Sequence, residues 1–334
     1  MNLRFSLRSS LLGPLLLNSL LLNSLLLSSL LLGSAPALAQ ATRYPLTIQS
    51  CNREVTFNEA PRHALSHDIN MTQMMLVLGL APRMVGYSGI SGWKSVTPQM
   101  AQMLDGLPEV AAKYPSVETL LNANVDFFFA GWDYGMRVGG DLTPQTLLPL
   151  GVNVYELTES CAFVMKRPPA SLDDTYNDLR NLGKIFDVQD RANELIATMQ
   201  AQAARIREQL PARQPRVFLY DSGEDRAMTS GRLGMPQALI DAAGGRNILD
   251  DVETSWTRVN WENVIERNPE VIVIVDYGEV SAEQKKQFLL SNPALQSVDA
   301  IKHRRFIVIP YVQATPSVDN VLAVQTLADG FHRP

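Results

Sequence analysis

The sequence of 334 residues predicts an α/β protein of two Rossmann-like lobes, joined by one long α-helix, with a ligand cleft between the lobes. Three observations support this fold class. The segments that begin at Ser116 and Asn260 repeat one pattern, strand and helix patterns alternate on both sides of residues 172–210, and that interval is itself helical with almost no Gly or Pro. A chain of this length is expected to form two domains of about 100–150 residues.

Residues 1–39 are interpreted as a secretory signal peptide. Arg4 and Arg8 precede a leucine-rich tract, and the small residues Ala37 and Ala39 form an A-x-A cleavage site. The alternative is a transmembrane anchor, although Asn and Ser interrupt the leucines. No cysteine follows the cleavage site, which argues against lipid attachment. We therefore expect an exported protein cleaved after Ala39.

The charge and the two cysteines indicate which functions are excluded and in which compartment the protein folds. Loss of Arg4 and Arg8 leaves 27 basic against 34 acidic residues, a formal charge of −7, which excludes nucleic-acid binding by bulk charge. Beyond the signal peptide, no segment is apolar enough to span a membrane. In an oxidising compartment Cys51 and Cys161 are expected to form a disulfide; the alternative is two separate buried thiols.

The predicted elements follow in β-α-β order. We expect an N-terminal lobe over residues 40–171, connecting helices over 172–210 and a C-terminal lobe over 211–334. The first lobe has strands 44–51, 53–61 and 63–67, helix 70–80, strand 84–89, the first repeat copy, a helix near 143–150 and strand 153–157. Two helices follow, one ending near Phe186 and the long connecting helix from about Gln189 to Leu210. The second lobe has strand 216–223, helix 235–245, the second copy, helix 281–291, strand 304–311 and a helix from about 318.

Each repeat copy predicts a capped helix, a tight turn and a buried strand. The first residue can cap the helix, a glutamate in the first turn complements the helix dipole, and an asparagine ends the helix because it tolerates left-handed geometry. A continuous apolar strand is typical of parallel sheets covered on both faces. The matched positions are Ser116 with Asn260, Glu118 with Glu262, Asn124 with Asn268 and Asp126 with Glu270.

The order of several segments resembles a known family. These are GLAPRMVGYSG, YPSVETLLNANVDFFFAG, LRNLGKIFDVQDRANEL, TSGRLGMPQALIDAAGGRNIL, VNWENVIERNPEVIVIV and RRFIVIPY. Together they resemble the class III (single-helix-hinge) periplasmic substrate-binding proteins of ABC importers for ferric siderophores, haem and cobalamin. The segments CNREVTFNEAP and ELTESCAF are most similar to the ferric-siderophore branch. The resemblance implies a periplasmic monomer that binds a small metal chelate and docks on an inner-membrane permease dimer.

The resemblance also implies a role for the repeated glutamates. In this family one glutamate per lobe, at the start of such a helix, docks onto an arginine pocket of one permease subunit. Glu118 and Glu262 occupy these positions. Alternatively, each glutamate only favours a helix N-terminus, by about 0.3–1 kcal/mol.

Enzyme motifs are absent from the sequence. The histidines His63, His67, His303 and His332 lack the H-E-x-x-H spacing, and there is no C-x-x-C, G-x-S-x-G, Walker loop or G-x-G-x-x-G. We therefore expect no catalytic residues, no resident metal site and no cofactor. His67 follows the first core strand and could line the cleft, or it could form a satisfied loop pair with Asp68.

Loops at the carboxyl ends of strands are expected to form the cleft. Aromatic rings and arginines in these loops suit a large, flat or oxygen-rich ligand, although loop aromatics can also pack on their own lobe. The candidate ligand-binding residues are Trp132, Arg137, Trp256, Arg258, Trp93, Tyr134, Arg226, His67, Tyr87 and Tyr311. Trp261 is assigned to a helix start instead.

The sequence thus predicts a periplasmic receptor that binds an iron-siderophore-type chelate between two lobes and delivers it to an ABC importer. One alternative keeps this fold and binds cobalamin or haem. Another is an exported chelatase or reductase that acts on a metal chelate.

Overall fold

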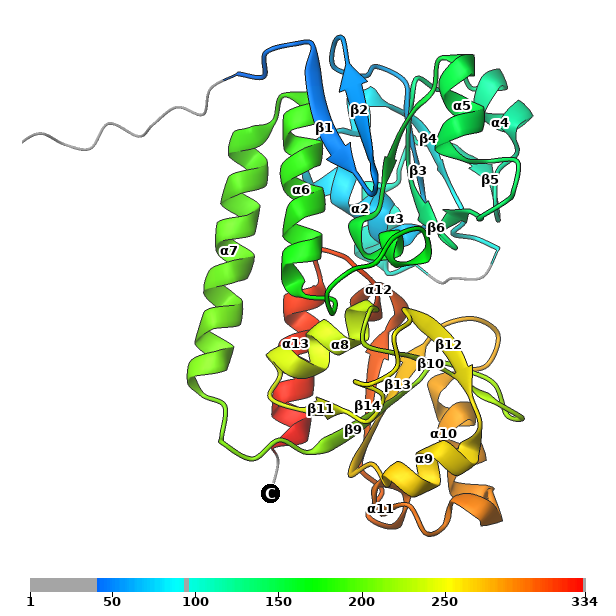
Figure 1. Ribbon diagram of the computed structural model, residues 1–334, viewed down its shortest axis with the longest axis vertical. Coiled ribbons are helices and arrows are strands. Elements are labelled where there is room, and N and C mark those ends of the chain that lie inside the picture. Colours follow the sequence, from blue (N-terminus) through cyan, green and yellow to red (C-terminus); the bar gives the residue numbers. More distant parts are fainter. Residues whose placement is uncertain (1–40, 93–95, 333–334) are drawn as a thin grey trace, which may run out of the picture. The chain divides into compact units, whose positions relative to one another are not determined.

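The computed structural model describes residues 41–92 and 96–332, and within them two parallel sheets define two lobes (Figure 1). The sheet of the first lobe, the N-lobe, has the order β5-β4-β3-β6-β7, and β8 also pairs with β6, all in parallel. Its strands are β3 (Ala64–His67), β4 (Met84–Ser88), β5 (Glu109–Ala111), β6 (Phe127–Trp132), β7 (Gly135–Met136) and β8 (Asn153–Glu156). Its helices are α2 (Ile69–Val77), η1 (Ala81–Arg83), α3 (Pro98–Met103), α4 (Val117–Asn122), α5 (Pro144–Leu147), η2 (Leu148–Leu150) and η3 (Thr158–Phe163).

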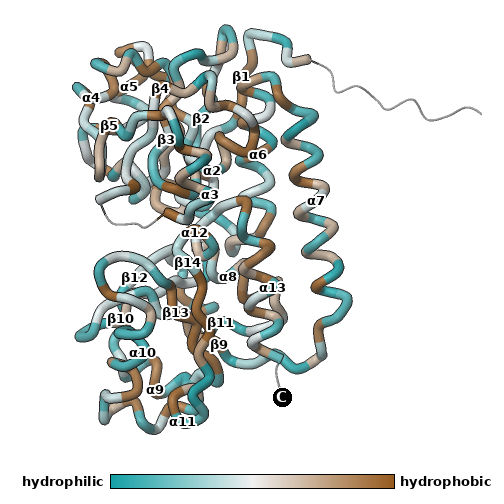
Figure 2. Tube along the Cα trace, turned by 180° about the vertical axis from the view of Figure 1, so that it is seen from behind, coloured by the Kyte–Doolittle hydropathy of each residue, from teal (hydrophilic) through white to brown (hydrophobic). Residues whose placement is uncertain are grey.

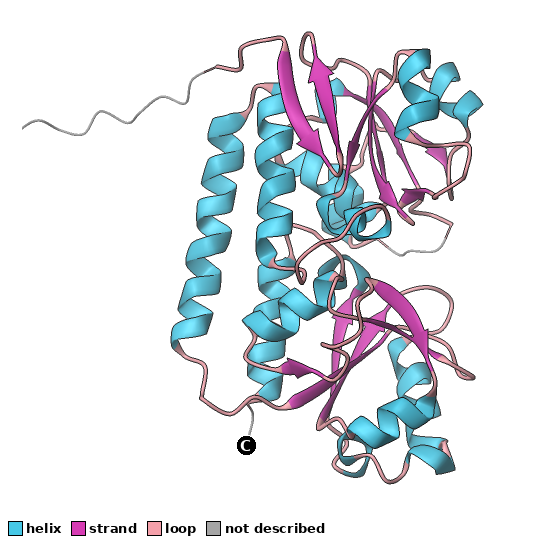
Figure 3. Cartoon of the chain, viewed as in Figure 1, coloured by secondary structure: helices cyan, strands magenta, loops and turns pink. Residues whose placement is uncertain are grey.

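The sheet of the second lobe, the C-lobe, is also parallel, with the order β11-β9-β13-β14. Its strands are β9 (Arg216–Tyr220), β11 (Arg246–Asn247), β13 (Val271–Asp276) and β14 (Phe306–Pro310), and an antiparallel pair is formed by β10 (Ala227–Ser230) and β12 (Trp256–Val259). Its helices are α8 (Met235–Ala242), α9 (Trp261–Arg267), α10 (Ala282–Ser291), η4 (Pro293–Leu295), α11 (Asp299–Lys302), α12 (Tyr311–Ala314) and α13 (Asn320–Phe331). Figure 3 shows helices on both sides of the strands of each lobe.

Two connecting helices lie side by side along the lobes (Figures 1 and 2). They are α6 (Leu172–Phe186) and α7 (Gln189–Glu208), close to the predicted bounds. Asp187 between them has a left-handed backbone (φ 58°), which lets the chain reverse at once. The predicted long helix is therefore confirmed, and α6 adds a second helix beside it.

The N-terminal strand pair is held to the N-lobe by a disulfide. The strands β1 (Leu46–Ser50) and β2 (Arg53–Phe57) pair antiparallel, and Cys51 lies in the turn between them. Cys51 and Cys161 form the expected bond, which closes a loop of 110 residues. Such a bond is expected to stabilise the fold by a few kcal/mol.

Hydrophobic packing follows the sheets. The strands β6 and β13 are buried almost throughout, as their continuous apolar runs predict. Figure 2 shows the corresponding hydrophobic strands in the interior of the C-lobe. Among the described residues, no helix is long and apolar enough to cross a membrane.

The two repeat copies adopt the predicted structure, with one exception. Ser116 accepts a hydrogen bond from the Thr119 backbone N–H and so caps α4. Asn260 occupies the corresponding position before α9, but its side chain makes no capping bond, so that part of the prediction is wrong. Asn124 (φ 50°) and Asn268 (φ 40°) both have left-handed backbones and end their helices as expected.

Candidate functional site: the cleft between the lobes

The first feature of the cleft is a hydrogen bond across it, which a ring contact and a second hydrogen bond extend into the C-lobe. Asp68 follows β3 of the N-lobe, and Tyr311 follows β14 of the C-lobe. The Tyr311 hydroxyl donates to Asp68 Oδ2 over 2.8 Å. The Tyr311 ring packs on Tyr277 with 5.0 Å between centroids, and the Tyr277 hydroxyl donates to Asp221 Oδ2 over 2.9 Å. Burial and the charge of Asp68 raise the pKa of Tyr311, so the hydroxyl keeps its proton.

A second set of interlobe contacts surrounds Tyr134, in the turn after β6. The Trp256 indole N–H donates to the Tyr134 hydroxyl oxygen over 2.7 Å, which joins the C-lobe pair β10–β12 to the N-lobe. Beside it, the Ser255 hydroxyl donates to Glu159 Oε1 over 2.5 Å. Burial raises the pKa of Tyr134 well above its usual value, and the charge of Glu159 adds to that effect. Two sequence-predicted site residues, Tyr134 and Trp256, are thus brought together.

The N-lobe wall of the cleft contains a stack of three side chains. His67 is buried, with its Nδ1 3.0 Å from the Ser88 hydroxyl, and its ring lies 5.0 Å from that of Tyr114. Arg137 is exposed and places its guanidinium carbon 4.9 Å from the centre of the Tyr114 ring. A cation over an aromatic face is attracted by the ring quadrupole. His67 therefore supports the wall from inside, whereas Tyr114 and Arg137 form its outer part.

Glycine makes this stack possible at one point. Gly135 has φ 96°, a conformation that other residues rarely adopt, and a Cβ there would lie 2.6 Å from Cγ of His67. The backbone of β7 therefore packs directly on the imidazole ring. The buried, hydrogen-bonded state of His67 agrees with the alternative of a satisfied residue rather than a ligand contact.

The C-lobe rim supplies two exposed arginines. Arg226 donates to the Arg258 carbonyl oxygen over 2.9 Å, which holds the two residues together across the β10–β12 pair. Burial raises the pKa of Asp221, while the positive charge of Arg258 opposes the rise. Arg258 thus lies within electrostatic reach of the chain that runs from Asp221 through Tyr277 to the N-lobe.

The structure does not bring every predicted residue into the cleft. Trp132 is buried in an N-lobe core cluster, and its indole N–H donates to Glu156 Oε1 over 2.9 Å. That prediction is corrected because the ring at the end of β6 packs inward. Tyr87 is half-buried in β4 opposite Glu109. Trp93 lies outside the described residues.

Sequence reasoning missed three residues of the site: Tyr114, Glu159 and Ser255. Tyr114 precedes the first repeat copy, at the same kind of strand-to-helix junction that identified the other loops, so the signal was present. Glu159 lies in a 3₁₀ turn after β8 and is completely buried. No sequence pattern marks a carboxylate whose partner stands about a hundred residues further along the chain.

Cavities at the cleft differ in size. A cavity of about 270 Å³ lies between the lobes and is lined by Ile69, Gln73 and Met100 of the N-lobe and by Tyr277, Tyr311 and Asp319 of the C-lobe. A more open groove of about 800 Å³ runs along the N-lobe from Arg137 and Tyr114 to Ser116 and Glu118. Within residues 41–92 and 96–332, no cluster of three His, Cys, Asp or Glu side chains could hold a metal ion.

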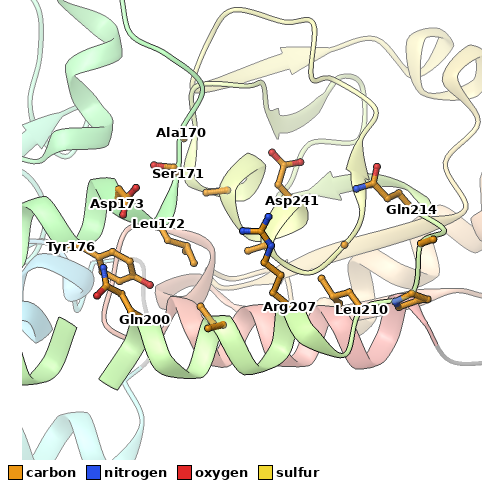
Figure 4. A pocket seen from close by; sticks show the side chains of 17 residues that line it. Ala170, Ser171, Leu172, Asp173, Tyr176, Gln200, Arg207, Leu210, Gln214 and Asp241 are labelled. Carbon is orange, nitrogen blue, oxygen red and sulfur yellow. The ribbon is translucent and has the colours of Figure 1, made fainter. Parts of the chain in front are cut away.

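Another hollow, of about 870 Å³, lies away from the cleft, between the connecting helices and α8. Figure 4 shows Arg207 of α7 and Asp241 of α8 on facing sides of this groove. Its polar lining has charges of both signs, and it does not lie at the carboxyl ends of the sheet strands, where open α/β sheets bind ligands. We therefore assign the binding function to the cleft.

Two similar lobes, a helical connection and a cleft at the strand ends define a two-lobe solute-binding protein. Residues 68–312 match the periplasmic binding protein family, and the chain belongs to that family. It is a solute-binding protein of an ABC importer and not an enzyme, so the chelatase or reductase alternative is set aside.

Individual relatives agree with this assignment. A periplasmic binding protein from Veillonella parvula is 28% identical, with a TM-score of 0.75 over 86% of this chain and 97% of that one. A protein of the ABC-type Fe³⁺-hydroxamate transport system of Saccharomonospora viridis shares the fold, with 21% identity and a TM-score of 0.72 over 87% of this chain and 100% of that one. The vitamin B12-binding protein of Yersinia pestis is 23% identical over 65% of this chain and 70% of its own length.

Proposed function

We propose that this solute-binding protein captures a ferric-siderophore-type chelate in the interlobe cleft. The observation that supports this cargo is the combination of exposed arginines and aromatic rings on both lobes. Arg137 lies over the Tyr114 ring on one lobe, and Arg258, held by Arg226, lies on the same strand as Trp256 on the other. Guanidinium groups pair with carboxylates and other oxygen-rich anions, and aromatic rings supply contact area at low entropy cost. A ferric chelate of oxygen donors presents both kinds of surface.

Binding of such a ligand requires the lobes to separate. The interlobe cavity of about 270 Å³ is smaller than the roughly 300–1,000 Å³ of most small-molecule pockets. The bonds from Trp256 to Tyr134 and from Tyr311 to Asp68 join the two lobes directly. A bulky chelate would displace these bonds and leave the aromatic and hydroxyl groups free to contact it. The ligand would thus replace a direct lobe-to-lobe contact.

Delivery would use the two repeated glutamates. Glu118 on α4 and Glu262 on α9 are both exposed in the first turn of their helices. A two-fold permease dimer offers one equivalent surface to each lobe, and the repeat supplies one carboxylate for each. Export by a signal peptide cleaved after Ala39 would bring the protein to this partner.

Tryptophan fluorescence tests the cargo. Trp256 is half-buried in the cleft, whereas Trp132 and Trp261 are buried in the lobes. Adding a ferric siderophore should quench the emission, and the iron-free chelator should quench it less. Trp256→Phe should remove most of the quenching while Trp261→Phe should retain it. Equal quenching by iron-loaded and iron-free forms would contradict recognition of the ferric chelate.

Cobalamin is the second candidate, because vitamin B12-binding proteins are among the relatives. The same cleft aromatics could contact a corrin ring. A preference for cobalamin over every ferric chelate would keep the fold and the transport role and change only the cargo.

A further inference from the structure

Glu159 connects the lobes in a way that neither the cargo nor the docking role explains. This residue belongs to η3 of the N-lobe, and its side chain is completely buried. Its Oε1 accepts the hydrogen bond from Ser255 of the C-lobe, whereas its Oε2 has no hydrogen-bond partner among the described residues. A buried carboxylate with one unsatisfied oxygen is costly, and a buried neutral carboxyl group costs much less.

The C-lobe side of this contact is the start of a helix. Helix α8 begins after Gly234, which has no side chain to cap it. A Cβ on Gly234 would lie 2.2 Å from Ser230 Oγ and 3.3 Å from Glu159 Oε1, so the absence of a side chain leaves room for both groups. The backbone N–H of Met235, the first residue of α8, also stabilises the charged form of Glu159. The Glu159 carboxyl group therefore lies at the start of a helix of the opposite lobe.

We propose that Glu159 is a proton-dependent latch between the lobes, so that closure binds a proton and separation releases it. Closure buries this carboxyl group against Ser255 and α8, and separation exposes it to water. The inference goes beyond the proposed cargo and holds for any ligand of the cleft.

The surroundings of Glu159 favour its neutral form. Burial raises its pKa to about 7, and the hydrogen bond from Ser255 opposes this rise. Of the nearby charged groups, Asp174 raises the pKa further and Arg167 lowers it, and these two residues form an ion pair with each other. Tyr134 also faces this site and keeps its proton.

The direction of the pH effect follows from these values. In the open state, water should return the pKa of Glu159 toward the usual 4.5. Below pH 4.5 the group is protonated in both states, and closure carries no ionisation cost. Between pH 4.5 and about 7 the open state is ionised while the closed state holds its proton, so closure becomes less favourable as pH rises. Because the two pKa values differ by about 2.5, the ratio of closed to open protein can change by at most about 300-fold over the whole pH range.

Amide hydrogen exchange of the ligand-free protein measures this ratio. The Ala170 N–H donates to the Arg232 carbonyl across the lobes over 2.9 Å, so its protection reports interlobe opening. The Ile248 N–H donates to the Val217 carbonyl within the C-lobe and serves as the reference. After correction for the intrinsic rate, protection of Ala170 should fall by about 100-fold between pH 4.5 and 8, and that of Ile248 should not follow. Constant protection of Ala170 would overturn the proposal.

Two variants test whether the pH dependence comes from Glu159 or from any buried acid with a raised pKa. Glu159→Gln should make the protection of Ala170 independent of pH. Asp178→Asn is the matched control, because burial also raises the pKa of Asp178 to about 7 but its partners Tyr155 and Thr158 belong to the N-lobe. The control should keep the pH dependence of Ala170. A Glu159→Gln profile equal to that of the wild type would overturn the latch.

A third variant covers the case in which Glu159→Gln does not fold. Ser255→Ala removes the hydrogen bond that lowers the pKa of Glu159. The loss of Ala170 protection should therefore begin at the same pH, level off at a higher pH than in the wild type and become larger in total. A loss that levels off at the wild-type pH with the wild-type size would contradict the proposal.

Discussion

The two repeat copies share their scaffold, whereas the residues that follow their strands differ. In the N-lobe, Asp126 accepts hydrogen bonds from the backbone N–H groups of Arg62 and His63, just before β3. In the C-lobe, Glu270 accepts one from the backbone N–H of Arg216, at the start of β9. The same acidic position thus fastens the repeat strand to its neighbour in each lobe.

Beyond the strands this similarity ends. The N-lobe strand β6 ends at Trp132, which packs into the core, and the C-lobe strand β13 ends at Asp276, which is exposed and accepts the Ala282 N–H. The repeat therefore specifies one interior strand and one helix of each lobe. The side chains that line the cleft come from loops outside the repeated segments.

The largest expected effect concerns the two buried tryptophans. Trp132 donates to Glu156 in the N-lobe and Trp261 donates to the Glu224 carbonyl in the C-lobe, both over less than 3 Å. Trp132→Ala and Trp261→Ala should each lower the free energy of unfolding by about 3–5 kcal/mol, because each leaves a large cavity. Chemical denaturation measures this loss. The control Trp256→Ala should cost clearly less, and equal losses at Trp132 and Trp256 would place Trp132 outside the core.

The second largest effect should come from removing the two glutamates that are proposed to dock on the permease. The double variant Glu118→Ala with Glu262→Ala should reduce uptake by about 100-fold or more, since truncating one side of a buried interfacial charge pair costs about 2–5 kcal/mol. Each single variant should give a smaller and similar loss, and ligand affinity should stay nearly unchanged. Uptake by whole cells measures the effect. The control pair Glu194→Ala with Glu208→Ala, both on α7, removes the same charge and should import normally. Normal import by the docking double variant would leave the repeat with a purely architectural role.

A smaller effect should distinguish the cleft rims. Arg258→Ala on the C-lobe and Arg137→Ala on the N-lobe should each weaken ligand binding by about fivefold to tenfold, because an anchoring charge commonly contributes more than about 1 kcal/mol. Calorimetric titration measures both. The control Arg62→Ala removes an exposed arginine that pairs with Glu59, away from the cleft, and should bind normally. A loss at only one rim would show that the ligand rests on one lobe.

The smallest effect tests the shared turns. Asn124→Ala and Asn268→Ala remove the short polar side chain that lets asparagine tolerate left-handed geometry, which should cost up to about 1–2 kcal/mol. Thermal denaturation should show a lower melting temperature for both variants. Asn268 also bonds Asp299 through its side chain, so its shift should be the larger of the two. A larger shift at Asn124 would contradict the equivalence of the turns.

Sequence patterns predicted the fold well because the relevant signals are local. Continuous apolar runs identified β6 and β13, and the chain reversals at Asn124 and Asn268 were visible as asparagines. Export implied the bond between Cys51 and Cys161.

The cleft was predicted less completely because its contacts are long-range. Tyr134, Trp256 and Tyr311 were identified from their loops, yet nothing in a loop shows whether a ring turns outward, and Trp132 turns inward. The bond between Glu159 and Ser255 depends on how two lobes meet. The residues around Glu159 and Ser255 in the sequence therefore do not predict this contact.

The most direct test of the central claim is a calorimetric panel on the purified mature protein. Ferric siderophores, their iron-free forms, cobalamin and haem are titrated under one set of conditions. At least one ferric siderophore should bind with micromolar or tighter affinity, and its iron-free form should bind more weakly. The proposed cargo is wrong if every ferric siderophore binds no better than millimolar while cobalamin or haem binds in the micromolar range or tighter.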